Sequence, residues 1–145
     1  MVNEILEDHV KIVESVDSWQ ESIRVAAVKL LEKDYITEDY VEAAINNIIK
    51  NGPYIIIIPK VAIPHSRPED GVNETSASLL KLNTPVMYPK DNPVTVVLML
   101  AAADKEKHLK MISSLTDLLS DQEKMSMIMD ATEEEEILNI LKLNR

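Results

Sequence analysis

The amino-acid sequence predicts an α/β fold in which a mixed β-sheet of about five strands is sandwiched between helices. Segments with apolar residues at helical spacing alternate with short apolar runs rich in β-branched residues, which is typical of an α/β layer sandwich. The chain has 145 residues, of which 46% are hydrophobic and 28% charged, so it is long enough to bury one sizeable core. We therefore expect a single domain over residues 1–145.

The N-terminal half is expected to contain one strand followed by two helices. The strand is predicted over residues 10–16 (VKIVESV). Ser18 and Glu21 form a capping box at the start of the first helix, and Thr37 caps the second. The sequence Asn-Gly-Pro at 51–53 ends this second helix, because glycine and proline do not continue it.

Four apolar segments predict the sheet. The run YIIII at 54–58 is apolar on both faces, as a central strand covered by helices requires. Residues 76–82 and 85–88 predict two further strands with a turn at 83–84 between them. The segment VTVVLML at 94–100 predicts a second strand that is buried on both faces.

The C-terminal part returns to helical spacing, starting at Asp104. Capping boxes at 120–123 (SDQE) and 132–135 (TEEE) predict two more short helices. The acidic block at 133–136 then lies at a helix start, where the helix dipole favours negative charge.

Composition excludes several functions. The net charge of −10 and pI near 4.7 argue against DNA, RNA or anionic lipid as partners. Without cysteine there are no disulfides, thiolate metal sites or thiol nucleophiles, and with glycine only at 52 and 71 no phosphate-binding glycine loop forms. No signal peptide is visible, and the apolar runs are shorter than the about 20 residues that span a bilayer. We expect a cytoplasmic protein without membrane insertion and without a cofactor.

Of the three histidines, His65 is the best placed for chemistry. It lies in VAIPHSRPEDGV (61–72), where Pro64 and Pro68 stiffen the backbone on either side. Stiff loops at strand ends are frequent places for active sites in α/β proteins. The alternative is a loop histidine that only fills space. His9, by contrast, lies in a polar N-terminal segment and is expected to be exposed, without a partner.

His108 is predicted in the first turn or so of the helix that begins at Asp104. Residues four and seven positions on, Ile112 and Leu115, share its face, so its ring should point inward. The amides at a helix N-terminus attract anions, which suits a ring that donates a hydrogen bond to a phosphoryl group. The alternative is a core histidine bonded to a backbone carbonyl.

Four segments resemble a known family: GPYI (52–55), IPHSRPEDGV (63–72), SLLKLNTPV (78–86) and KHLKMISSLTDLLSD (107–121). They are similar to the enzyme IIA domains of the bacterial sugar phosphotransferase system, in the mannitol and fructose class. The motif PHxRPEDGV resembles the ascorbate branch most. The resemblance covers nearly the whole chain.

The resemblance implies an α/β sandwich that acts as a phosphocarrier. Members accept a phosphoryl group from the histidine-containing phosphocarrier protein on a histidine that His65 matches. They pass it to a cysteine of a sugar-specific enzyme IIB, which serves a membrane permease. His108 matches the second active-site histidine, which contacts the phosphoryl group.

Four neighbours of His65 complete the candidate site. Arg67 is a candidate phosphate clamp together with Ser66, the alternative being ordinary loop solvation. Glu69 or Asp70 is a candidate for orienting a His65 nitrogen, the alternative being turn residues. Nothing in their spacing demands a metal ion.

Two departures from the family pattern concern the backbone and charge near the site. Family members commonly have a glycine where Lys60 stands, and mannitol-branch members carry an arginine in the region of 46–50, where this chain offers only Lys50. A phosphorylation-sensing regulatory module of the same fold, without a transport role, is the alternative function. The sequence leaves a homodimer open and does not name the sugar.

Overall fold

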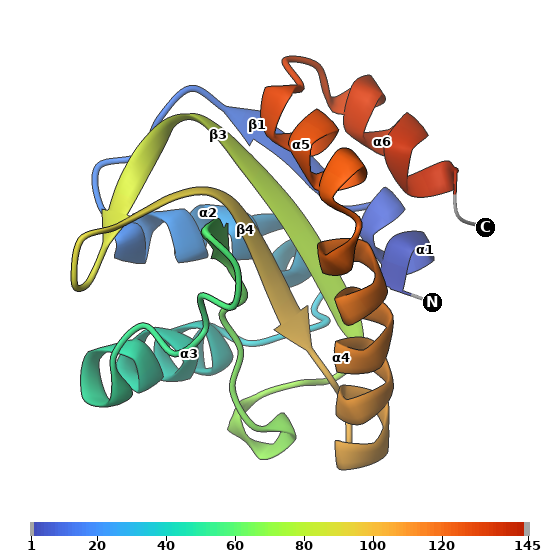
Figure 1. Ribbon diagram of the computed structural model, residues 1–145. Helices are drawn as coiled ribbons and strands as arrows, with labels where there is room; N and C mark the ends of the chain where they lie inside the picture. The colour runs from blue at the N-terminus through green and yellow to red at the C-terminus, as the bar shows by residue number, and fades with distance from the viewer. Residues whose placement is uncertain (1, 144–145) are drawn as a thin grey trace.

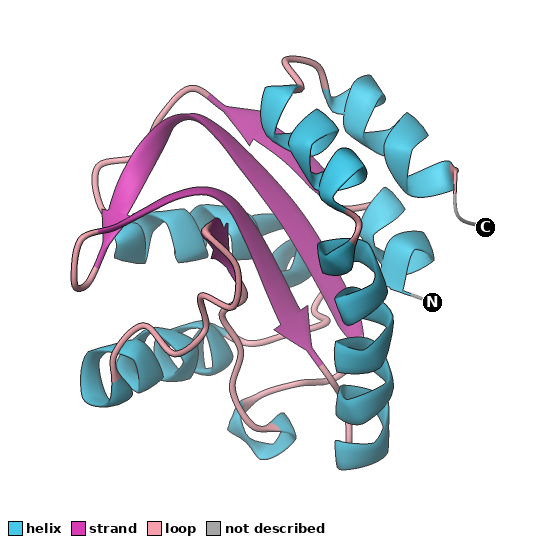
Figure 2. Ribbon diagram, viewed as in Figure 1, coloured by secondary structure: helices cyan, strands magenta, loops and turns pink. Residues whose placement is uncertain are grey.

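A computed structural model describes residues 2–143 and, within them, has a mixed sheet of four strands between helices (Figures 1 and 2). The order across the sheet is β1-β3-β4-β2. The two long central strands are antiparallel to each other, and each short outer strand is parallel to its neighbour. The α/β prediction is confirmed, with four strands in place of about five. The strands are β1 (Val10–Val13), β2 (Lys60–Ala62), β3 (Ser76–Tyr88) and β4 (Asn92–Ala101).

The helices form two groups, one on either side of the sheet (Figure 1). On one side are α2 (Trp19–Glu32) and α3 (Glu38–Asn51). The other group consists of α1 (Val2–Glu7), α4 (Lys105–Ser120), α5 (Gln122–Asp130) and α6 (Glu134–Lys142). Every β4 residue from Val96 to Ala101 is buried, as expected for a strand covered on both faces.

Two of the predicted helix caps are confirmed. The Ser18 hydroxyl accepts a hydrogen bond from the backbone amide of Glu21 at 3.1 Å and begins α2. The Thr37 hydroxyl accepts from the amide of Tyr40 at 3.4 Å and begins α3. Each cap satisfies one otherwise unpaired amide and stabilises the fold by about 1 kcal/mol.

The two C-terminal caps were each predicted one residue too early. The hydroxyl of Ser120 donates to the Thr116 carbonyl within α4, so Asp121 caps α5 in its place. The reciprocal capping box of α6 joins Glu133 and Glu136. The acidic block therefore does lie at a helix start.

The predicted central strand at 54–58 is wrong. Gly52 (φ +83°) ends α3 and the chain turns at once, with the Ile56 amide donating to the Pro53 carbonyl at 3.1 Å. Ile55 is buried, whereas Ile57 is 62% exposed. Prolines at 53 and 59 lack the amide hydrogens that a strand ladder needs, so pairing with β4 falls to β2.

The predicted turn at 83–84 is also wrong, because β3 continues through it as one strand. The pairing of β3 with β4 shifts register between Lys81 and Val86, which marks a β-bulge or similar irregularity. The Thr84 amide bonds to the Glu14 carbonyl at 2.9 Å, beyond the end of β1. Polar residues and a proline suit such an irregularity as well as a turn.

The N-terminal segment was predicted incorrectly at His9. The described residues begin with α1, which the sequence did not predict, and β1 ends at Val13 instead of continuing to residue 16. His9 is 5% exposed and fully partnered. Its Nδ1 lies 2.9 Å from the Ala77 carbonyl, and its Nε2 lies 2.8 Å from the Lys33 ammonium nitrogen.

Candidate functional site

The candidate site is built on residues 63–71, the segment that follows β2 and is called here the His65 loop. Its start is fixed to the sheet, since the Leu100 amide of β4 donates to the Pro64 carbonyl at 3.1 Å. Its end makes a short 3₁₀ turn, Pro68–Asp70, closed by Gly71 at φ +137°. A Cβ at Gly71 would lie 2.1 Å from the Thr37 hydroxyl oxygen, so only glycine fits there.

The imidazole of His65 is held in one tautomer. Its Nδ1 lies 2.7 Å from the carbonyl oxygen of Ile63, and because a carbonyl only accepts, Nδ1 carries the hydrogen and donates it. Nε2 is then left with a free lone pair. Burial lowers the pKa of His65, the Ile63 bond opposes that shift, and the nearby His108 lowers the pKa further. His65 is therefore neutral at physiological pH.

His108 comes to the same place from α4. The rings of His65 and His108 have centroids 5.4 Å apart and are inclined by 44°. His108 is half-buried, in keeping with the predicted inward orientation. The two rings line one pocket of about 280 Å³. The other residues lining it are Asn47, Tyr54, Ser66, Arg67, Pro68 and Lys105.

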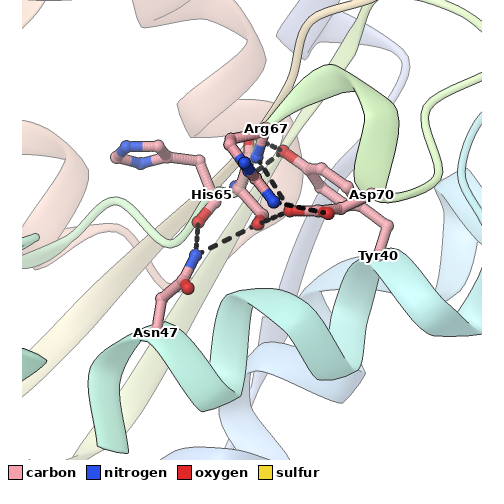
Figure 3. Close-up of polar contacts among 6 residues, drawn as sticks. Tyr40, Asn47, His65, Arg67 and Asp70 are labelled. Atoms are coloured by element: carbon pink, nitrogen blue, oxygen red, sulfur yellow. Dashed lines mark hydrogen bonds and ion pairs between the residues drawn. The ribbon is translucent and has the colours of Figure 1, made fainter. Parts of the chain in front are cut away.

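Behind the imidazole, polar side chains tie the His65 loop to α3. Asn47 donates from Nδ2 to the Ser66 hydroxyl at 3.0 Å and, at 3.4 Å, to the His65 carbonyl. The Ser66 hydroxyl donates to the carboxylate of Asp70. This bond is the main reason that the pKa of Asp70 lies below its ordinary value. Figure 3 shows the imidazole of His65 pointing away from this network.

Tyr40 connects the same loop to the sheet. Its hydroxyl accepts from the Ser66 amide at 3.0 Å and donates to the Leu100 carbonyl at 2.6 Å. Tyr40 is fully buried, and burial raises its pKa to about 12. The hydroxyl thus stays protonated and able to donate. The strand β2 ends before it reaches Leu100 of β4. The backbone amide of Leu100 bonds to Pro64 and its carbonyl to Tyr40, so both backbone groups still have hydrogen-bond partners.

Of the four predicted neighbours of His65, two line the pocket that contains its ring and two do not. Ser66 and Arg67 line the pocket, although the Arg67 side chain is 75% exposed and its guanidinium lies 3.6 Å from Asp70. Asp70 bonds to Ser66 and to the Arg67 amide, while Ile63 bonds to the His65 ring. Glu69 is exposed and lines a neighbouring pocket.

Three residues of the pocket were missed from the sequence: Asn47, Tyr54 and Lys105. Asn47 could have been found, because it lies three and seven positions after the buried Ala44 and Tyr40 and so shares their helix face. Lys105 stands three positions before His108 on α4, which also places both on one face. Tyr54 was assigned to a strand that does not form, and its ring meets that of His65 edge-on at 6.3 Å.

Within residues 2–143, no cluster of three or more potential metal-binding side chains is present. No helix in this part of the chain has the length and apolarity needed to cross a bilayer.

Curated proteins are similar to this chain in sequence. The chain is 38% identical over 136 residues to the mannitol-specific cryptic phosphotransferase enzyme IIA component of Escherichia coli, covering 93% of this chain and 92% of that protein. It is 29% identical over 135 residues to the ascorbate-specific EIIA component of the same species, covering 91% and 88%. Identity is thus higher to the mannitol-specific protein than to the ascorbate-specific one.

Solved structures of enzyme IIA proteins are also similar to this chain, over nearly its whole length. The solution structure of the mannitol-specific cryptic enzyme IIA from Escherichia coli is similar with a TM-score of 0.93 and 35% identity, over 99% of this chain and 100% of that chain. A crystal structure of a IIA protein from Streptococcus mutans is similar with a TM-score of 0.87 and 26% identity, over 97% and 91%.

Together the fold, the pocket and these relatives define the class as a phosphotransferase enzyme IIA component. The family described as "Phosphoenolpyruvate-dependent sugar phosphotransferase system, EIIA 2" matches residues 4–144. The chain belongs to this family.

Proposed function

We propose that the chain, as one domain over residues 1–145, is a cytoplasmic phosphocarrier that accepts a phosphoryl group on His65. The donor is the histidine-containing phosphocarrier protein, and the acceptor is a cysteine of a sugar-specific enzyme IIB that serves a membrane permease. One observation carries this proposal: a neutral imidazole whose Nδ1 is committed to the Ile63 carbonyl and whose ring shares a pocket with His108.

The transfer needs no proton movement at the attacking atom. The lone pair of His65 Nε2 forms a bond to phosphorus while the donor's phosphorus–nitrogen bond breaks and leaves its electron pair on the donor nitrogen. The His65 ring gains positive charge, and the Nδ1–H bond to the Ile63 carbonyl, at 2.7 Å, stabilises that charge. The onward step to a thiolate of enzyme IIB reverses this exchange and restores the neutral ring.

His108 and the start of α4 contact the transferring group in this proposal. An imidazole N–H of His108 donates a hydrogen bond to a phosphoryl oxygen, and the helix N-terminus adds partial positive charge. Arg67 is the proposed clamp beside them, with Ser66 close to the phosphoryl group. Transfer between two proteins depends on positioning and charge neutralisation, so no cofactor is required.

Apolar surface beside the pocket suits transient docking of the two partners. Tyr54 lines the pocket and is 49% exposed, and Leu109, next to His108 in the chain, is 66% exposed. Exposed apolar residues beside a site favour protein contacts. The mannitol and ascorbate specificities named for the relatives indicate a sugar or sugar-like substrate for the permease.

The test is phosphorylation by phosphoenolpyruvate in the presence of the general phosphotransferase proteins. Intact-protein mass spectrometry should show one added phosphoryl group on the wild type and none on His65→Ala. His9→Gln, which changes a histidine outside the pocket, is the control and should be labelled. Equal labelling of His65→Ala would show that the assignment is wrong.

A second experiment separates the carrier from the sensing module. Deletion of the gene should abolish uptake of one sugar, and the wild-type chain should restore it while His65→Ala should not. Normal uptake with altered transcription would instead identify a regulatory protein.

A further inference from the structure

The charge of the pocket points to one additional residue, on the basis of the proposed phosphocarrier function. The chain carries a net charge of −10, and this field repels an incoming phosphoryl dianion. Local cations at the pocket must therefore offset it. Of the described residues that line the pocket, Arg67 and Lys105 are the ones with a guanidinium or ammonium group.

Arg67 is already engaged by a carboxylate. Its guanidinium lies 3.6 Å from Asp70, and its backbone amide donates to the same carboxylate at 3.3 Å. Asp70 therefore offsets much of the charge that Arg67 brings to the pocket. The side chains of Arg67 and Lys105 are both exposed, so the carboxylate partner of Arg67 is what distinguishes the two cations.

Lys105 has no such neutralising partner. Across residues 2–143 no hydrogen bond or ion pair of its ammonium group is found, whereas two other lysines of the same helix are paired. Lys107 lies 3.9 Å from Asp104, and Lys110 lies 3.3 Å from Glu106. The uncompensated charge that α4 contributes to the pocket therefore belongs to Lys105.

The position of Lys105 is unfavourable for the helix itself. It is the first residue of α4, where the positive end of the helix dipole repels a cation. Arg67, Pro68 and Lys105 also line a second pocket of about 580 Å³ directly beside the first. The two cationic side chains thus lie at the boundary between the two pockets.

We propose that Lys105 is a phosphate-binding residue of this site. Its ammonium group binds the phosphoryl oxygens during transfer and while His65 carries the phosphoryl group. Among the described residues that line the pocket, it is the cation without a carboxylate partner.

The test compares Lys105→Met, which keeps the length of the side chain, with Lys107→Met as the matched control one half-turn away. Removing one cation from a partly open anion site should lower kcat/KM for phosphorylation by about tenfold in Lys105→Met, with little change in Lys107→Met. Lys105→Arg should retain most of the wild-type rate, because it restores the charge. Thermal unfolding should show Lys105→Met folded and at least as stable as the wild type.

A second readout separates phosphate binding from a merely structural role. Loss of a bound cation raises the pKa of the phosphoryl group on His65, which phosphorus NMR measures directly on the loaded protein. Lys105→Met should show this rise and Lys107→Met should not. If the wild type is labelled on His65 but both methionine variants behave alike, Lys105 has no such role while the phosphocarrier function stands. If the wild type is never labelled, both proposals are overturned.

Discussion

Replacing Tyr40 with phenylalanine removes one buried oxygen and leaves the ring in place. The Ser66 amide and the Leu100 carbonyl then lose the partners that now lie at 3.0 and 2.6 Å. Each buried group without a partner costs about 1–3 kcal/mol. We therefore expect Tyr40→Phe to lower the free energy of unfolding by about 2–6 kcal/mol.

Tyr88→Phe is the matched control, because Tyr88 is also almost fully buried. Its hydroxyl lies 2.7 Å from that of Ser22, which also donates to the Trp19 carbonyl and so keeps a partner after the change. The expected loss is about 0.5–1.5 kcal/mol. Urea denaturation measures both values.

The two variants should also differ in activity. Tyr40→Phe removes the hydroxyl bonds that join Ser66 of the His65 loop to β4, while the bond between Pro64 and Leu100 remains. The variant should therefore slow phosphorylation of His65, because a less precisely positioned nucleophile reacts more slowly. Tyr88→Phe should not. If Tyr40→Phe is no less stable than Tyr88→Phe and is phosphorylated at the wild-type rate, the Tyr40 hydroxyl does not hold the loop.

Two further changes test the backbone and the buried histidine. Lys60 has φ +73°, a conformation that favours glycine, so Lys60→Gly should raise the free energy of unfolding by about 1 kcal/mol in urea denaturation, whereas Lys60→Ala, which keeps the Cβ, should not. Burial and then Lys33 lower the pKa of His9 below 6.5, so the folded state disfavours its protonated form. Stability should therefore decrease as pH falls below about 6.5 and level off below the folded-state pKa. His9→Gln should reduce the difference in stability between about pH 7.5 and pH 5. An unchanged difference would show that His9 is not its source.

The parts of the fold that depend on neighbouring residues were predictable. Ser18 and Thr37 cap their helices because each bond is made within three residues. The long apolar segment of β4 is buried on both faces, as its composition indicates. The segment YIIII at 54–58 has a similar composition but lies between two prolines, and its surroundings, not its residues, decide that it turns.

The candidate site was predictable in its two histidines but not in its supporting contacts. The prolines around His65 and the helix phase of His108 are local features. The distance of 5.4 Å between the two ring centroids depends on how α4 packs beside the His65 loop. The Ile63 carbonyl is a backbone atom and leaves no pattern in the sequence. His9 was predicted incorrectly because its partners, Ala77 and Lys33, lie on elements distant in the chain.

The bonds from Tyr40 and Asn47 have a consequence for how partners distinguish the two states of a phosphocarrier. They join the His65 loop to β4 and α3, so the nucleophile moves with the rigid body of the protein. Loading then adds the phosphoryl group and its negative charge at the pocket, while the backbone around it stays in place. Donor and acceptor proteins would each meet the same backbone surface and would tell empty from loaded by the phosphoryl group and its charge.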